Sequence, residues 1–142
     1  MAKVVGEFKD KLSPVAKGPD VTELKFRGTF NGEDMHYPHE MISGCKMLER
    51  CIDCCTELSN IRDEGDGGLF VKVDGNIVHP MFMLDAYEIY TWLIKQGNTS
   101  RVYGFEMWKT SEYDKESDLS EVFDEPVLAV KGEVVFVVGT HV

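Results

Sequence analysis

Five side chains able to move protons or bind an anion lie within seven residues of this 142-residue chain: Asp34, His36, Tyr37, His39 and Glu40. They stand in a polar loop just before the only long helix that the sequence predicts. Backbone amides at the start of a helix are unpaired and carry positive potential, so a carbonyl oxygen placed there is polarised. A carboxylate or imidazole beside that carbonyl can then take or give a proton. The pattern predicts chemistry where the loop meets the helix.

The same residues also have simpler interpretations. Glu40 in a first helical turn would interact favourably with the helix dipole. His36 would be a structural histidine bonded to backbone, which is commoner than a catalytic one. His39 is expected to be exposed. Ser43 lies near no histidine and acid in the order of a catalytic triad, so the sequence does not favour it as a nucleophile.

The predicted helix begins after Tyr37-Pro38 and runs to Ile61, because proline suits a first helical turn. Polar residues such as Lys46 and Arg50 form one face. The apolar stripe contains Met41, Ile42, Cys45, Leu48, Ile52, Cys55 and Leu58, and it is widened by Met47, Cys51, Cys54 and Ile61. We therefore expect other elements to cover most of this helix, which the glycines after Arg62 end.

Segments with alternating or β-rich sequence are predicted as strands: 21–30, 69–78, 81–96, 100–111 and a pair within 127–139. Asp74-Gly75 and Lys131-Gly132 are expected to form turns or bulges. Residues 81–96 also fit a helical face, but their aromatic and β-branched content favours a strand. Residues 113–125 are acidic and are expected to form a surface loop or a short helical turn. The order predicts an α+β fold, an antiparallel sheet wrapped around one long central helix.

Length and charge limit the protein classes. Residues 1–20 are expected to form a loosely attached leader, and residues 21–142 a single domain. The net charge of −10 and pI near 4.8 argue against nucleic acid or an anionic membrane as partner. No apolar run reaches a membrane span and the first residues lack a signal-peptide core, which favours the cytoplasm. A phosphorylated ligand would need a local basic patch, for which the candidates are Lys72, Lys95, Arg101 and Lys109.

The four cysteines, Cys45, Cys51, Cys54 and Cys55, all fall within the predicted helix. Their spacing does not suit disulfide geometry, so we expect reduced, buried, small apolar side chains. The Cys51-x-x-Cys54 pair lies about three turns into the helix, whereas reactive pairs stand at a helix N-terminus. No metal site is predicted, because no second cysteine pair exists and His39 precedes the helix. The glycine patterns of nucleotide-binding loops are absent.

Short segments spread over roughly residues 24–138 carry a family resemblance: Asp34-Met-His-Tyr, Ile42-Ser-Gly-Cys-Lys-Met-Leu, Thr56-Glu-Leu, Gly65-Asp-Gly-Gly-Leu-Phe, Gly97-Asn-Thr-Ser-Arg, Phe105-Glu-Met-Trp-Lys and Glu125-Pro-Val-Leu. In this order they resemble the small hot dog fold 3-aminobutyryl-CoA and β-alanyl-CoA ammonia lyases of amino-acid fermentation. The hot dog fold that the resemblance implies agrees with the wrapped sheet expected from the strand and helix pattern.

The resemblance implies an acyl-CoA substrate, reversible loss of ammonia from its 3-position, and a site between the subunits of a homodimer or a larger homo-oligomer such as a hexamer. It implies no metal and no cofactor beyond the CoA moiety. Asp34, His36 and Tyr37 are catalytic by this match. Our hypothesis for their individual roles is that Asp34 is a base or an orienting carboxylate and that His36 and Tyr37 place the proton and the carbonyl. Within other matched segments, the predicted substrate-binding residues are Ser43, Gly44, Arg101 and Lys109.

One departure bears on the reaction. After the tyrosine the family has a small residue and then Gly-Asn, where this chain has Pro38-His39-Glu40. Glu40 is therefore predicted as a catalytic acid or base, either in an altered lyase or as the activator of water in a thioesterase. The runner-up functions are an acyl-CoA thioesterase and an enoyl-CoA hydratase-like enzyme. A CoA-binding protein without catalysis is a third class, in which Asp34→Asn and Glu40→Gln would change nothing.

Overall fold

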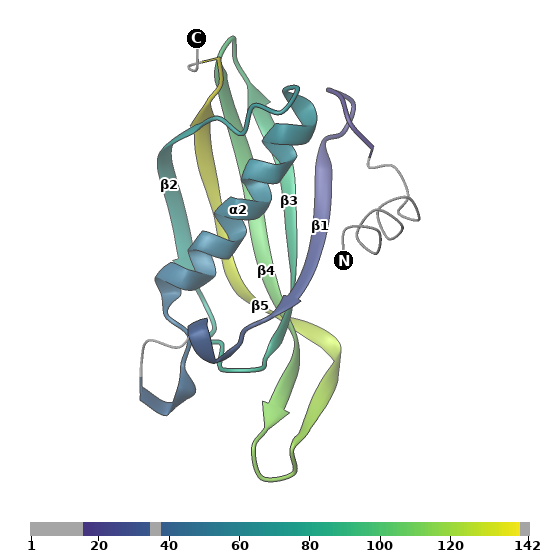
Figure 1. The fold of residues 1–142 in the computed structure, drawn as a ribbon, viewed down its shortest axis with the longest axis vertical. Coiled ribbons are helices and arrows are strands. Elements are labelled where there is room, and N and C mark those ends of the chain that lie inside the picture. Colours follow the sequence, from purple (N-terminus) through teal and green to yellow (C-terminus); the bar gives the residue numbers. More distant parts are fainter. Residues whose placement is uncertain (1–15, 35–37, 140–142) are drawn as a thin grey trace, which may run out of the picture.

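A computed structural model describes residues 16–34 and 38–139. Figure 1 shows five strands forming a curved sheet, with helix α2 (Gly44–Arg62) lying across its concave face. The sheet is antiparallel, in the order β1-β3-β4-β5-β2. Its strands are β1 (Glu23–Thr29), β2 (Leu69–Ile77), β3 (Ala86–Gln96), β4 (Ser100–Asp114) and β5 (Leu119–Val137). This confirms the predicted wrapped sheet and the choice of a strand over a helix within 81–96, although the strand begins only at Ala86.

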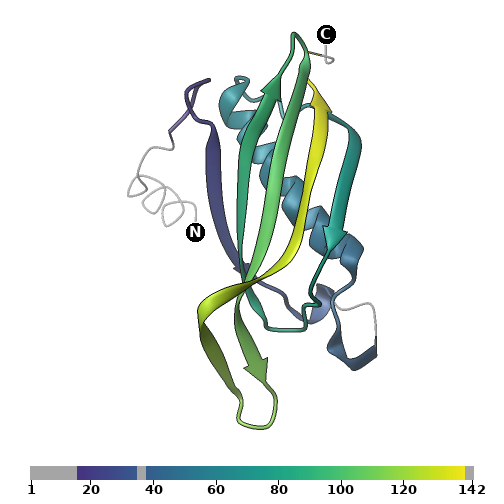
Figure 2. The same ribbon diagram turned by 180° about the vertical axis from the view of Figure 1, so that it is seen from behind.

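The core lies between the concave face of the sheet and α2. From Tyr87 to Thr91 of β3 and from Arg101 to Ser111 of β4 every second side chain is buried, as a sheet covered on one side requires. The buried apolar side chains include Ile89, Tyr103, Phe105 and Met107 from the sheet, and Met47, Cys51, Cys55 and Leu58 from the helix. Seen from behind in Figure 2, the opposite face of the sheet carries no helix formed by the described residues.

The predicted helix start was wrong, because α2 begins at Gly44. A short 3-10 turn, η2 (Pro38–Glu40), precedes it, and within that turn His39 and Glu40 have φ angles of 65° and 64°. These left-handed conformations cannot continue an α-helix. Ser43 is the N-cap, and its hydroxyl accepts a hydrogen bond from the Lys46 amide at 3.1 Å. Glu40 is thus outside the helix, and the helix-dipole interpretation of this residue is corrected.

The buried face of the helix also differs from the predicted stripe. Cys45, predicted to be buried, is exposed, whereas Cys51 and Cys55 are fully buried and Cys54 is partly buried. All four cysteines are free thiols, as expected. Burial raises the pKa of Cys54 and of Cys55 to about 12, so these thiols stay protonated and serve as apolar packing groups.

Two further expectations for the strands are corrected. Gly75 and Gly132 are not turn residues but pair directly inside β2 and β5. A Cβ at Gly132 would lie 2.7 Å from the Phe105 ring, so glycine makes room for this core aromatic. The acidic segment 113–125 is mostly strand, because β4 and β5 continue to pair up to Asp114 and Leu119. Backbone pairing overrides the polar composition there.

Part of the predicted leader is bonded to the helix end. The Gly18 amide donates to the Ile61 carbonyl at 2.9 Å, and the Pro19 carbonyl accepts from Arg62 at 2.7 Å. Residues 1–15 lie outside the described part of the chain. Within the described part, no helix is both long and apolar enough to cross a membrane.

Candidate functional site

The loop between β1 and α2 rests on the turn that precedes β3. Backbone hydrogen bonds join the two at both ends of the loop: the Leu84 amide donates to the Phe30 carbonyl at 2.7 Å, and the Ile42 amide donates to the Met81 carbonyl at 2.9 Å. Such bonds satisfy backbone groups that would otherwise be buried without partners. They hold the loop in place against the start of the helix.

Lys109 lies beneath this turn. Its ammonium is 3.0 Å from the Asp85 carboxylate and 3.1 Å from Glu112, and the Lys109 and Asp85 side chains are each only 1% exposed. Asp85 also accepts from the Phe82 amide at 2.9 Å, which fixes the turn. Lys109 was predicted to bind substrate. Its ion pairs instead make Lys109 a support for the loop, acting through Asp85, and a direct contact with substrate stays a prediction.

Asp34 is the most constrained acid of the loop. It is 5% exposed in the 3-10 turn η1 (Gly32–Asp34), and its carboxylate accepts from the Asn31 amide at 3.0 Å. Both of its oxygens also lie 2.9 Å from Nη2 of Arg50. Burial alone would raise the pKa of Asp34, but the Asn31 amide and the Arg50 cation more than offset this and hold that pKa below its ordinary value.

Arg50 is the functional candidate that the sequence did not reveal. From the second turn of α2 its guanidinium binds Asp34 and also donates to the Tyr87 hydroxyl at 2.9 Å. It stands 5.3 Å from the centre of the Phe30 ring, a favourable cation–π distance. Sequence periodicity had assigned Arg50 to the polar face. A buried carboxylate such as Asp34 needs a nearby cation, and this requirement was the signal that could have pointed to Arg50.

Glu40 lies at the other end of the loop and is more accessible. Its side chain is 34% exposed, and its carboxylate is 2.9 Å from the ammonium of Lys115. Lys115 belongs to the turn of the β4–β5 hairpin that projects below the sheet in Figure 1. The left-handed backbone of Glu40 is fixed by its own carbonyl, which accepts from the Met83 amide at 2.9 Å.

The helix start stands beside the loop. Ser43 is 6% exposed, and its hydroxyl is engaged as the helix cap. Gly44 is the first helical residue, and an added Cβ there would lie 3.2 Å from Ile77 of β2. Because glycine has no side chain, the N-terminal end of the helix, which carries positive potential, can lie against the edge of the sheet.

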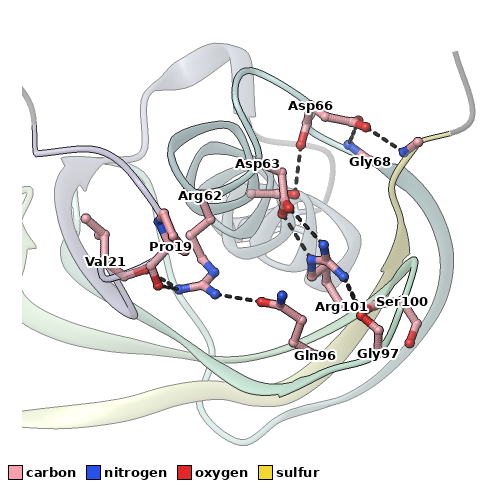
Figure 3. A network of polar contacts seen from close by, with 12 residues as sticks. Pro19, Val21, Arg62, Asp63, Asp66, Gly68, Gln96, Gly97, Ser100 and Arg101 are labelled. Carbon is pink, nitrogen blue, oxygen red and sulfur yellow. Dashed lines mark hydrogen bonds and ion pairs between the residues drawn. The ribbon is translucent and has the colours of Figure 1, made fainter. Parts of the chain in front are cut away.

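Arg101 lies elsewhere. Figure 3 shows it at the C-terminal end of α2, where its guanidinium binds both oxygens of Asp63 at 3.1 and 2.9 Å. A helix of 19 residues is about 28 Å long, so α2 separates Arg101 from Ser43 at its N-terminus. The neighbouring Arg62 donates to the carbonyls of Pro19 and Val21, both at 2.7 Å. These contacts join the helix end to β1 and β4, and a substrate role for Arg101 stays a prediction.

Of the predicted catalytic residues, His36 and Tyr37 lie outside the described residues. The described residues thus bring Asp34, Glu40, Ser43 and Gly44 to the junction of loop and helix, with Arg50 as the added member. No cluster of three potential metal ligands occurs among the described histidine, cysteine, aspartate and glutamate side chains.

The comparisons by sequence and by structure both find ammonia lyases that act on CoA thioesters. No family model matches the chain. The curated 3-aminobutyryl-CoA ammonia lyase of Acetoanaerobium sticklandii is 32% identical over 111 residues, which are 76% of this chain and 86% of that protein. The solved β-alanyl-CoA:ammonia lyase of Clostridium propionicum matches with a TM-score of 0.77 and 25% identity, over 82% of this chain and 85% of the other.

A more distant structure shares the fold. It is an acyl-CoA hydrolase of Staphylococcus aureus in complex with butyryl coenzyme A, coenzyme A and coenzyme A disulfide. The TM-score is 0.64 at 10% identity, with 86% of this chain and 68% of the other covered. At that identity the likeness is one of fold, and it confirms the architecture that the sequence predicted.

Proposed function

Since this chain belongs to the hot dog fold family of 3-aminobutyryl-CoA and β-alanyl-CoA ammonia lyases, we propose that it reversibly removes ammonia from a short 3-aminoacyl-CoA. The products are the enoyl-CoA and ammonia. The observation that carries the proposal is the 32% identity to a curated lyase over 86% of that protein's length. The geometry of the loop and helix start supports it.

The reaction needs one proton acceptor and one place for negative charge. A base takes the proton from C2 of the substrate, and the thioester carbonyl holds the resulting negative charge as an enolate. Collapse of the enolate forms the double bond between C2 and C3 and breaks the bond from C3 to the nitrogen of the protonated amino group, which takes the electron pair and leaves as ammonia. The thioester itself acidifies C2, so the proposal includes no cofactor beyond the CoA moiety.

The structure supports different roles for the two acids. Asp34 already accepts one backbone bond and two contacts from Arg50, and its pKa is held low, so it suits an orienting carboxylate better than a base. Glu40 is partly exposed and contacts a solvent-exposed lysine, which suits a carboxylate that exchanges a proton. We assign the base to Glu40.

The helix start supplies the positive potential. The unpaired amides around Ser43 and Gly44 suit the binding of the thioester oxygen, where charge develops. His36 and Tyr37 keep their predicted roles of placing the proton and the carbonyl, and these roles await variants of both residues. Arg101 and Lys109 are better explained as structural cations, because both side chains are buried in ion pairs.

We further propose that the chain forms a homodimer along β2. This edge strand exposes a row of apolar side chains, of which Leu69, Phe70 and Val71 are 56%, 47% and 50% exposed. Long apolar edge strands invite pairing with another chain. The edge runs beside the helix start, where an added Cβ at Gly44 would touch Ile77, so a partner there would help to enclose the site. The free thiols suit the reducing cytoplasm.

The test is a paired assay of the purified protein with crotonyl-CoA or acryloyl-CoA plus ammonium. Loss of enoyl absorbance that depends on ammonium, without free thiol, is expected for the wild type. Glu40→Gln is expected to lose about 100-fold or more in rate, in the range of general-base catalysis. Lys17→Gln, at an exposed position outside the loop and the helix start, is the control. Thiol release without any need for ammonium would instead indicate the thioesterase.

A further inference from the structure

The Glu40 side chain, to which we assign the base, is bonded to an ammonium group. Its Oε1 atom lies 2.9 Å from Nζ of Lys115, which stands in the turn between β4 and β5. Among the described residues, the Glu40 carboxylate forms no other ion pair and no other side-chain hydrogen bond. Within that part of the chain, the group that occupies the base is thus a primary ammonium carried on a CH2 group.

This group is chemically the one that the proposed reaction removes. The substrate of the proposed lyase carries an ammonium on C3, and when the substrate is β-alanyl-CoA this C3 is also a CH2 group. A carboxylate that accepts a hydrogen bond from the Lys115 ammonium can accept the same bond from the substrate. Because C2 is bonded directly to C3, a substrate held by its ammonium also brings its C2 hydrogens to this carboxylate.

From this match we propose that Glu40 is also the binding site for the substrate ammonium, and that Lys115 occupies this site until the substrate displaces it. The inference rests on the proposed function, because it assigns a further task to the same base. Lys115 is here an internal competitor and not a catalytic residue, since it leaves the site before the substrate reacts. When the reaction runs in the direction of addition, the same site takes free ammonium.

The contact between Glu40 and Lys115 is built into the fold, because both backbones are bonded to the turn that precedes β3. The Met83 amide donates to the Glu40 carbonyl at 2.9 Å, and the Asp85 carboxylate accepts from the Tyr113 amide at 3.2 Å. Tyr113 lies in β4, two residues before Lys115. One turn therefore positions both the carboxylate and the start of the hairpin turn that presents the lysine.

The tip of the hairpin keeps its shape through bonds that do not involve the Lys115 side chain. The Asp114 carboxylate accepts from the Glu116 amide at 3.2 Å and from the Ser117 hydroxyl at 2.9 Å. The Lys115 side chain is 76% exposed and is bonded to Glu40. It can therefore turn into solvent while the backbone of the hairpin stays in place.

Displacement of Lys115 costs little binding energy. Ion pairs between exposed side chains change an equilibrium constant by about fivefold at most. Glu40 is partly exposed, so a ligand can reach it, and the CoA portion of the substrate supplies binding energy that offsets the cost. The hydrogen bond to Glu40 raises the pKa of Lys115, which keeps the lysine in its ammonium form and makes it a competitor by charge.

The exchange of one ammonium for the other suits the chemistry of the base. Lys115 would keep its charge throughout the reaction and would hold the carboxylate in its ionised form. The substrate ammonium instead becomes neutral ammonia, because nitrogen keeps the electron pair of the bond to C3 while Glu40 takes the C2 proton. The released ammonia then takes this proton from the Glu40 carboxyl group and leaves as ammonium, and Lys115 returns to the carboxylate.

Two unreactive thioethers of CoA test the inference by calorimetry. S-(3-aminopropyl)-CoA carries the ammonium but has no carbonyl to acidify C2, and S-propyl-CoA lacks the ammonium. In Lys115→Met the competitor is gone, so we expect the amino thioether to bind about two- to fivefold more tightly and the propyl thioether to bind as before. Lys115→Arg keeps a cation at Glu40 and is expected to bind the amino thioether no more tightly than the wild type. Lys17→Met, which removes an exposed lysine elsewhere, is the control.

The Glu40→Gln background completes the test, because without the carboxylate Lys115→Met should leave the affinity for the amino thioether unchanged. Four outcomes would overturn the inference: a wild type that does not bind the amino thioether, an unchanged affinity in Lys115→Met, equal tightening of both thioethers, or weaker binding of both. The last would indicate that Lys115 holds the phosphates of CoA. Thermal unfolding verifies that each variant is folded.

Turnover of acryloyl-CoA with ammonium is measured on the same samples, where Lys115→Met should lower KM for ammonium by more than it changes kcat. The thioethers do not react, so the binding result does not depend on turnover. The expected binding pattern without any turnover would count against the proposed function alone. Turnover by an enzyme whose affinity for the amino thioether ignores Lys115 would count against the ammonium site alone.

Discussion

Replacing Arg50 by methionine is expected to lower the proposed lyase activity by about 100-fold. Its guanidinium holds both oxygens of Asp34 and the Tyr87 hydroxyl, each at 2.9 Å, so its loss frees the loop from the helix. A displacement of about 1 Å in a catalytic site can cost that much in rate. Arg50→Lys keeps the charge but loses the forked geometry, and it should recover only part of the activity. Steady-state rates with crotonyl-CoA and ammonium measure both variants.

The pH dependence separates a positioning role from simple loss of fold. The pKa of Asp34 is lowered in the folded wild type, so the contribution of Asp34 to stability is present above its unfolded pKa. It is lost as the pH falls through the lower folded value. Without Arg50, burial is opposed only by the Asn31 amide and the weaker Coulombic attraction of Lys46, so the pKa of Asp34 rises. The acid limb of activity and of unfolding free energy should then move to higher pH.

Arg27→Met is the matched control for Arg50. Arg27 is 74% exposed and forms only a surface ion pair with Glu88, so wild-type rates and an unchanged acid limb are expected for this variant. An Arg50→Met enzyme with full activity, or with an acid limb at the wild-type pH, would show that Arg50 does not position Asp34.

Replacing Lys109 by methionine is expected to cost about 3–5 kcal/mol of unfolding free energy, because it leaves the buried Asp85 carboxylate without its cation. This is a large share of the 5–15 kcal/mol that is typical of a whole domain. The turn held by Asp85 supports the catalytic loop, so activity should fall together with stability. Urea unfolding at neutral pH, followed at one fixed protein concentration, measures the effect.

A second substitution distinguishes the ion pair from simple packing. In Lys109→Met/Asp85→Asn no buried charge is left unpaired, because Glu112, the other partner of Lys109, is 51% exposed. The amide oxygen can still accept from the Phe82 amide, so most of the lost stability should return. Lys17→Met, at an exposed position, should stay within about 0.5 kcal/mol of the wild type. A double variant as unstable as Lys109→Met would contradict the role of the ion pair.

The elements that the sequence predicted well are those whose pattern repeats over many residues. Alternation in β3 and β4 survives because one face of the sheet is buried throughout, and the helix keeps its period for 19 residues. The order of short motifs then led to the right family. Both signals sum over long stretches, which makes them resistant to a local exception.

The errors arose where a single residue, or a contact with a segment far along the chain, determines the local backbone structure. Pro38 suggested a helix start, but the left-handed backbone at His39 and Glu40 is fixed by a hydrogen bond from Met83, a residue far along the chain. The acidic segment after Tyr113 was expected to be a loop, although its backbone pairs as a hairpin that brings Lys115 to Glu40. Polar composition alone does not report such pairing.

The residue types of the loop led to its prediction as the site, but they did not reveal the contacts that its side chains make. Residue types placed Asp34 and Glu40 near each other in the sequence, whereas their partners come from other elements. Arg50 lies 16 residues from Asp34, and Lys115 lies 75 residues from Glu40. These partners separate a buried orienting acid from an accessible one, a distinction that spacing within the loop does not contain.

The most direct test of the lyase assignment is to follow the nitrogen. Purified protein is incubated with crotonyl-CoA and isotope-labelled ammonium, and the thioesters are analysed by mass spectrometry, with Asp34→Asn and Glu40→Gln in parallel. We expect an intact aminoacyl-CoA that carries the label, formed by the wild type and strongly reduced in both variants. Consumption of crotonyl-CoA that yields free CoA or a hydroxyacyl-CoA, with no labelled thioester, would contradict the assignment.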